Sequence, residues 1–205
     1  IERLDIRIGD RVLIKKAAEI IPKVIKVVDS EEHNNLPKYI TPTYCPECNS
    51  PLVTREGEVN LYCANSECPS VVKARLEYWV SKEAMDIDFI GPSVISQLFA
   101  LGLVKNPLDL YKLSYDDFFK LEAVKDKSAS NMYNSIQESK NRPFSRLITA
   151  LSIRHVGKET AELIVGEFPN IETLKAATVE DFANVEGIGQ KIAETGIYCV
   201  GGKSL

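Results

Sequence analysis

The chain has 205 residues, of which 44% are hydrophobic and 26% are charged, and its formal net charge at pH 7 is −4. No apolar run is long enough to cross a bilayer, and the first residues lack the pattern of a secretory signal, so we expect a cytoplasmic protein with no membrane partner. The acidic balance also argues against a protein that coats DNA through bulk positive charge.

Residues 1–40 have the composition of β-strands. The segment IRIGDRVLIKKA alternates branched apolar and charged residues around a turn at Gly9–Asp10, and KVIKVV after Pro22 predicts a second strand. The polar EEHNNLP that follows is typical of a loop, in which His33 would be a solvated side chain. Two or three strands would expose a raw apolar face, so we expect the chain to begin inside a β-domain whose first strands precede residue 1.

Four cysteines in residues 41–72 form the most specific pattern of the chain. Cys45 and Cys48 are followed after fourteen residues by Cys63 and Cys68. Two such pairs provide four thiolates for one tetrahedral Zn²⁺, and since all four positions are filled by protein the metal would be structural. The alternative is a pair of disulfides, which a reducing cytoplasm disfavours. The intervening LVTREGEVNLYC predicts a hairpin with its turn at Glu56–Gly57, which completes a small zinc ribbon.

From about Val72 onward the apolar spacing becomes helical. Ser114 and Thr178 have the sequence context of helix N-caps, because acids follow two or three residues later. The fifth cysteine, Cys199, is expected to be a buried, inert thiol in a helical stretch. The predicted helices are short and cover residues 73–84, 93–103, 107–113, 114–121, 127–140, 143–153, 158–168, 170–177, 178–185 and 190–200.

A short apolar turn opens a helix four times in this part, at residues 88–98, 121–136, 153–164 and 185–196. The period of roughly thirty residues indicates a repeated unit of helix, tight hairpin and helix. Glycine permits a left-handed turn and bares backbone N–H groups, and the dipole of the next helix favours an anion there. Such a turn can hold the DNA backbone without reading bases. The candidate DNA-binding residues are Ile90, Gly91, Lys127, Arg154, His155, Val156, Gly157, Lys158, Gly187, Ile188, Gly189 and Lys191.

The third and fourth hairpins are expected to be the stronger phosphate sites, because Ala123, Lys125 and Phe89 stand at tip positions of the other two where glycine would be ideal. His155 would face DNA or stabilise its turn, with a hydrogen-bonded structural histidine as the alternative. Residues 125–158 contain seven Lys or Arg against two acids, whereas residues 159–205 contain three against eight. The basic stretch can contact phosphates, although a solvated helical face is the alternative reading.

These features together resemble the C-terminal half of bacterial NAD⁺-dependent DNA ligase. The resemblance rests on DIRIGD with IIPKV, on CPEC with YCANSECP, and on LSIRHVG with EGIG, and it covers nearly the whole chain. It implies a mainly α, multidomain fold: the end of an OB-fold at 1–40, a four-cysteine zinc finger at 41–72 and a domain of four helix-hairpin-helix units at 73–205. Ser152 stands where the family commonly has glycine.

The resemblance also implies a function. The family seals nicks in duplex DNA during replication and repair, using NAD⁺ and Mg²⁺ through an adenylation domain whose lysine lies in a K-x-D-G motif, which this sequence lacks. It implies Lys15, Lys16 and Glu19 as OB-fold residues near the nick, with exposed strand charges as the alternative. We therefore expect a monomeric fragment of a bacterial cytoplasmic, nucleoid-associated enzyme that binds DNA but is inactive alone, lacking the adenylation domain and a C-terminal BRCT domain.

Two other functions remain open from the sequence. A stand-alone zinc and hairpin module could serve another repair or recombination protein, although such a module should not start within a sheet. A protein-interaction scaffold would use the finger as a rigid spacer, and salt-dependent DNA binding would argue against it.

Overall fold

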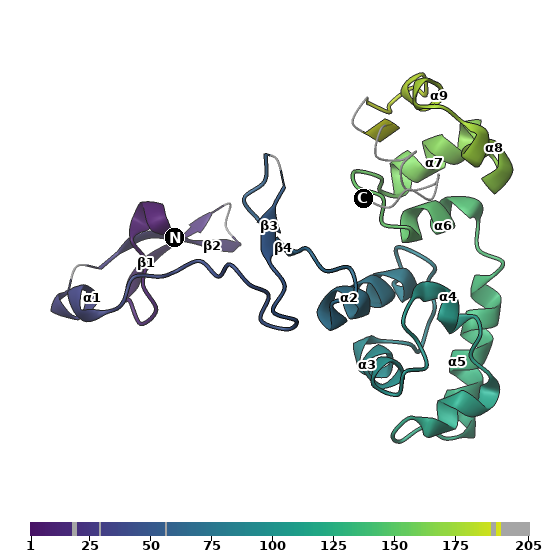
Figure 1. Cartoon of the computed structure of the whole chain (residues 1–205), viewed down its shortest axis with the longest axis horizontal. Coiled ribbons are helices and arrows are strands. Elements are labelled where there is room, and N and C mark those ends of the chain that lie inside the picture. Colours follow the sequence, from purple (N-terminus) through teal and green to yellow (C-terminus); the bar gives the residue numbers. More distant parts are fainter. Residues whose placement is uncertain (18–19, 29, 56, 190–191, 194–205) are drawn as a thin grey trace. The chain divides into compact units, whose positions relative to one another are not determined.

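The computed structural model describes residues 1–17, 20–28, 30–55, 57–189 and 192–193 (Figure 1). The chain divides into two compact units, Ile1–Ala64 and Asn65–Leu205. Within the described ranges, no helix has the length and apolar character needed to cross a bilayer.

The first unit contains the two strands predicted for its N-terminal part. β1 (Val12–Ala17) and β2 (Ile21–Val27) pair antiparallel, with Val12 opposite Val27 and a register irregularity between Leu13 and Ile14. The prediction was too long at its start, because residues 1–11 contain no strand: a 3₁₀-helix at Glu2–Leu4 is followed by a turn at residues 8–9. Apolar side chains of both strands are exposed, as expected for part of a larger sheet: Leu13, Ile14, Ile21 and Ile25.

The expected loop after β2 is wrong, because residues Glu31–Asn35 form a short helix, α1. Ser30 caps this helix by accepting a hydrogen bond from the His33 N–H, and two acids in the first turn favour it further. His33 is also not the solvated side chain that we expected: it is 15% exposed, with Nδ1 2.8 Å from Asp10 Oδ1. The Arg7 guanidinium donates to the carbonyls of His33 and Leu36, which ties α1 to the preceding turn.

The predicted cysteine-region hairpin is confirmed. β3 (Leu52–Thr54) pairs antiparallel with β4 (Leu61–Cys63), so that Leu52 faces Cys63 and Thr54 faces Leu61. The turn includes Gly57 at φ +75°, a left-handed conformation that glycine adopts at little cost. The strands are shorter than the pattern suggested, since Val59 lies outside both.

The second unit is helical, as predicted, and each helix lies on or beside a predicted range. Residues 115–120 form a 3₁₀-helix instead of an α-helix, and the expected helix at 190–200, with Cys199, lies largely outside the described residues. The α-helices are α2 (Pro69–Val80), α3 (Pro92–Ala100), α4 (Pro107–Leu110), α5 (Asp126–Ser139), α6 (Phe144–Ala150), α7 (Lys158–Glu167), α8 (Ile171–Ala176) and α9 (Val179–Ala183).

These helices pack around two hydrophobic cores. The first core joins α2 to α5, with Leu76, Leu98 and Phe118 fully buried, and Trp79 donates a hydrogen bond to the Tyr111 hydroxyl at 3.2 Å. The second core joins α6 to α9 around Ile164 and Phe182. Each core therefore encloses two of the four predicted hairpins and holds their turns in place.

The N-caps predicted at Ser114 and Thr178 are confirmed by reciprocal contacts with the acids three residues later. Asp117 Oδ2 accepts from the N–H and hydroxyl of Ser114, and Asp181 Oδ2 does the same for Thr178. Hydrogen bonds from Lys120 and from Ser114 lower the pKa of Asp117 from 3.8 to about 2. The carboxylate form is therefore favoured in the folded protein.

This pKa shift predicts a pH-dependent contribution to stability. Because the folded pKa is lowered, the contribution is present above about pH 3.8 and is lost as the pH falls toward about 2. We expect Asp117→Asn to lower the melting temperature at pH 7 by about 2–4 °C, the effect of losing one capping interaction. Melting curves from pH 7 to pH 2.5 should show the difference from the parent shrinking below pH 4. A difference that stays constant to pH 2.5 would contradict the assignment.

Candidate zinc centre and nucleic-acid interface

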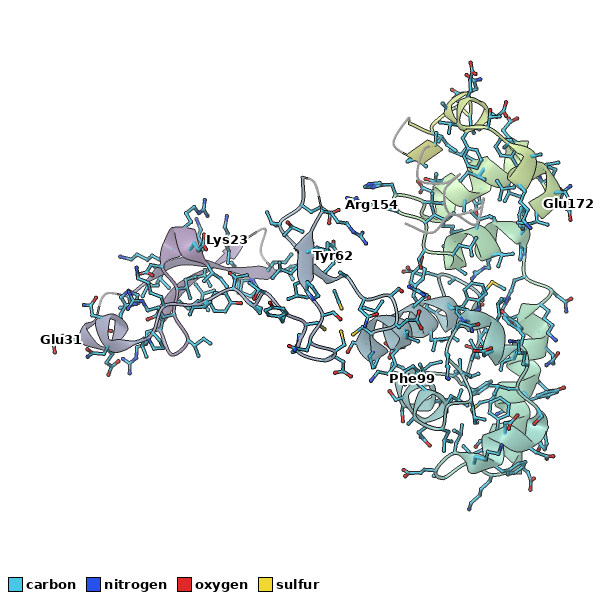
Figure 2. All side chains as sticks on the ribbon, viewed as in Figure 1. Lys23, Glu31, Tyr62, Phe99, Arg154 and Glu172 are labelled. Carbon is cyan, nitrogen blue, oxygen red and sulfur yellow. The ribbon has the colours of Figure 1, made fainter. Side chains whose placement is uncertain are left out.

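The four cysteines predicted to bind zinc come together. Their Sγ atoms all lie within 4.8 Å of one another, and Cys45 and Cys68 are buried. Cys48 Sγ lies 3.5 Å from Cys63 Sγ, far beyond the disulfide bond length of about 2.05 Å. Figure 2 shows sulfur atoms gathered at the base of the hairpin that carries Tyr62.

Local hydrogen bonds shape the backbone around each cysteine pair. In the first pair, Cys45 N–H donates to the Ser50 carbonyl and the Asn49 N–H donates to the Cys45 carbonyl, with Asn49 at φ +56°. In the second pair, Cys68 N–H donates to the Asn65 carbonyl. These backbone turns orient the cysteine thiols toward one another.

The donor set fits zinc. An ion with Zn–S distances of about 2.3 Å holds four tetrahedral sulfurs about 3.8 Å apart, which agrees with the observed cluster. Cys68 also precedes α2, so its sulfur lies at the helix end whose dipole favours a negative charge. Four thiolates leave no position for a catalytic water, and the arrangement is that of a structural site.

The four predicted hairpins share one backbone pattern, and in the first three a described helix follows the turn (α3, α5 and α7 in Figure 1). Each turn has a residue of positive φ, then an apolar residue, then a third residue, which in the first three turns is the N-cap of the next helix. The carbonyl of that last residue accepts the first helical hydrogen bond, at 2.9 to 3.1 Å in all four turns. The positive-φ residues are Phe89 (66°), Ala123 (59°), His155 (64°) and Gly187 (88°).

The glycines of these turns act differently from what we predicted. Only Gly187 provides a positive φ, whereas Gly91 and Gly157 are extended, with φ −99° and −93°. A Cβ added at Gly91, Gly157 or Gly189 would meet no atom within 4 Å. The backbone conformation therefore does not require glycine at Gly91 or Gly157, and each leaves open space where a side chain would stand. Sequence reasoning missed the non-glycine tips, and Ser152, at φ +53°, likewise adopts the conformation that its family glycine would favour.

The apolar turn residues point into the cores. Ile90, Val156 and Ile188 are between 4% and 6% exposed, so their side chains are not accessible to a ligand. Lys127, His155 and Lys158 are exposed, and Figure 2 shows Arg154 extending outward from the turn before α7. Lys15 and Lys16 are also exposed, whereas Lys191 and Glu19 lie outside the described residues.

Part of the basic stretch at 125–158 has a structural role. Arg146 Nη1 donates to the carbonyls of Lys82 and Ala84, both at 2.8 Å, and Arg142 Nη2 lies 2.8 Å from Asp86 Oδ2. These two guanidiniums hold the α2–α3 loop against the start of α6. The basic side chains at the turns are the better candidates for contact with a ligand.

Comparisons with known proteins agree with this architecture. A family model described as NAD-dependent DNA ligase OB-fold domain matches residues 1–36, one described as NAD-dependent DNA ligase C4 zinc finger domain matches residues 44–69, and one described as Helix-hairpin-helix motif matches residues 146–197. The last match covers the third and fourth hairpins.

Curated relatives named DNA ligase align over nearly the whole chain. The identity is 43% over 196 residues with Chlorobium phaeobacteroides, 43% over 194 residues with Bacillus subtilis and 41% over 194 residues with Geobacter sulfurreducens. Each alignment covers 95% of this chain but only 29% of the relative. The chain thus spans less than a third of the length of the curated relatives that it matches.

Proposed function

Because this chain belongs to the NAD-dependent DNA ligases, we propose that it is the part of such an enzyme that holds duplex DNA at a nick. The observation that carries the proposal is the open space at Gly157, the N-cap of α7, and at Gly189, where no atom would meet an added Cβ. A phosphate can approach backbone N–H groups at such points, where the helix dipole also favours it. Lys158 and Arg154 add positive charge at the same turn.

The zinc finger supports this role. The four cysteines would hold one structural Zn²⁺, whose binding free energy would fold a segment with little core of its own. We propose the domain boundaries 1–40, 41–72 and 73–205. The match of residues 1–36 to a ligase OB-fold favours this assignment over a stand-alone zinc and hairpin module.

The sealing chemistry is proposed to belong to the rest of the enzyme. That part would use NAD⁺ and Mg²⁺ through an adenylation domain, and the whole would act as a cytoplasmic monomer in replication and repair, with a BRCT domain at its far end. The 205 residues contain no K-x-D-G motif, so we expect this chain alone to bind nicked DNA without joining it. Lys15 and Lys16, exposed on β1, are proposed to approach the DNA near the nick.

The test is a titration of the chain onto nicked and intact duplex at about 50 and 200 mM salt, with zinc measured on the same sample. We expect affinity to fall with salt, because phosphate contacts release counterions. Lys158→Ala should reduce the slope of log K against log salt by about 1, while the exposed Lys175→Ala on α8 serves as the matched control. Absence of binding, with zinc present and helices folded, would refute the proposal.

A further inference from the structure

The first hairpin differs chemically from the third and fourth. Between Lys82 and Lys105 the sequence contains no Lys or Arg, and Pro92 occupies the first position of α3, where it has no N–H to donate. The third hairpin, by contrast, has Arg154 and Lys158 on either side of its glycine. The first hairpin therefore lacks both the charge and one of the donors with which its repeats can bind a phosphate.

Its tip carries an exposed aromatic ring. Phe89 is 63% exposed and has φ +66°, a conformation that is unusual for a bulky residue. The next residue, Ile90, is 4% exposed and belongs to the first core, so its side chain anchors the turn to that core. The fold thus tolerates a strained backbone and holds a large apolar side chain in water, which is typical of a residue kept for contact with a partner.

The charged residues near Phe89 indicate the chemistry of the surface that it would contact. Asp86 is neutralised by Arg142 at 2.8 Å, but Asp88, the residue before Phe89, is exposed. An exposed carboxylate repels phosphates, so the tip is unsuited to the phosphate rows of a duplex. An aromatic ring suits the sugar and base edges between those rows, where apolar side chains of many DNA-binding proteins insert.

We propose that Phe89 contacts the minor groove of the bound duplex through its ring, while the third and fourth hairpins hold phosphates. This inference rests on the proposed function. A DNA partner is favoured over a protein partner because the first hairpin shares its core with the second, through Ile90, Leu121 and Ala129. The second hairpin has exposed Lys125 and Lys127 at its turn. The first pair of hairpins thus combines an apolar tip with a basic one, which fits a groove with its flanking phosphates.

The test compares Phe89→Gly with Ala123→Gly in the titration described above. Both substitutions place glycine at a positive-φ tip and relieve the backbone, but only the first removes a ring. We expect Phe89→Gly to weaken duplex binding about 10-fold at both salt concentrations, as for loss of one aromatic contact with a base, with the salt slope unchanged. Ala123→Gly should bind within twofold of the parent. Neither variant should melt below the parent, since glycine suits the backbone better.

Two results would overturn the inference while leaving the proposed function in place. If the parent binds DNA and Phe89→Gly binds equally well, the ring serves another partner, such as a protein. If Phe89→Gly lowers the salt slope, the first hairpin holds a phosphate instead. Failure of the parent chain itself to bind DNA would instead remove the proposed function together with the inference.

Discussion

Cys63→Ser is expected to release the metal, so that zinc content falls from one ion per chain to none. Cys63 ends β4 and places its sulfur 3.5 Å from that of Cys48. Loss of one thiolate opens a structural site, and the three remaining ligands bind zinc too weakly to offset the entropy of ordering the finger. Structural zinc in such small segments contributes about 10–16 kcal/mol of apparent binding free energy, so the finger should unfold without it.

The unfolding should be local. The second unit has two hydrophobic cores made by residues 72–193, and these do not depend on the thiolates. We therefore expect helical circular dichroism to persist in Cys63→Ser while protease cleaves within residues 41–67. Zinc is measured by elemental analysis after gel filtration, and Cys199→Ser, which changes the fifth cysteine, is the matched control that should keep one ion. Retention of one zinc by Cys63→Ser would contradict the four-thiolate site.

Much of this arrangement could be predicted from the sequence, because the decisive signals are local. Cysteine spacing predicts the zinc cluster, and apolar periodicity with capping residues predicts the helices of residues 69–183. The expectation of a loop at residues 31–37 was wrong because two contacts of His33 stabilise α1. Its backbone N–H donates to the Ser30 hydroxyl, and its ring contacts the distant Asp10. A helix of five residues leaves almost no periodic signal, and a contact across more than twenty residues leaves none.

The turn geometry shows a different limit. The repeat could be recognised in the sequence. Each glycine, however, was expected to adopt the left-handed conformation of its turn, because glycine does so at little cost. In the structure the left-handed position of three turns is held by a residue other than glycine: Phe89, Ala123 and His155. Tertiary packing of Ile90, Val124 and Val156 holds these residues in a conformation that their local preference opposes. Only the structure shows which residue of a turn adopts the left-handed conformation and which one leaves open space beside the backbone.

That distinction predicts a large effect for Gly157→Val. Gly157 is the N-cap of α7 and has φ −93°, a value that valine adopts readily, and a Cβ added to it would meet nothing within 4 Å. The fold should therefore accept valine, and the melting temperature should stay close to that of the parent. The branched side chain would occupy the space through which we propose that a phosphate reaches the backbone N–H groups. Hydrogen bonds to charged groups contribute about 1.5–3 kcal/mol, so duplex affinity should fall by about 10- to 100-fold.

The loss should be similar for duplexes of different sequence, because phosphate contacts carry no base information. Gly166→Val is the matched control: Gly166 lies near the other end of α7 and also has open space around it. That variant should bind DNA like the parent, and its melting temperature should not fall, because valine has a higher helix propensity than glycine. Fluorescence anisotropy on two duplexes of unrelated sequence measures both variants. Unchanged affinity of Gly157→Val, with α7 intact by circular dichroism, would remove the third hairpin from the DNA interface.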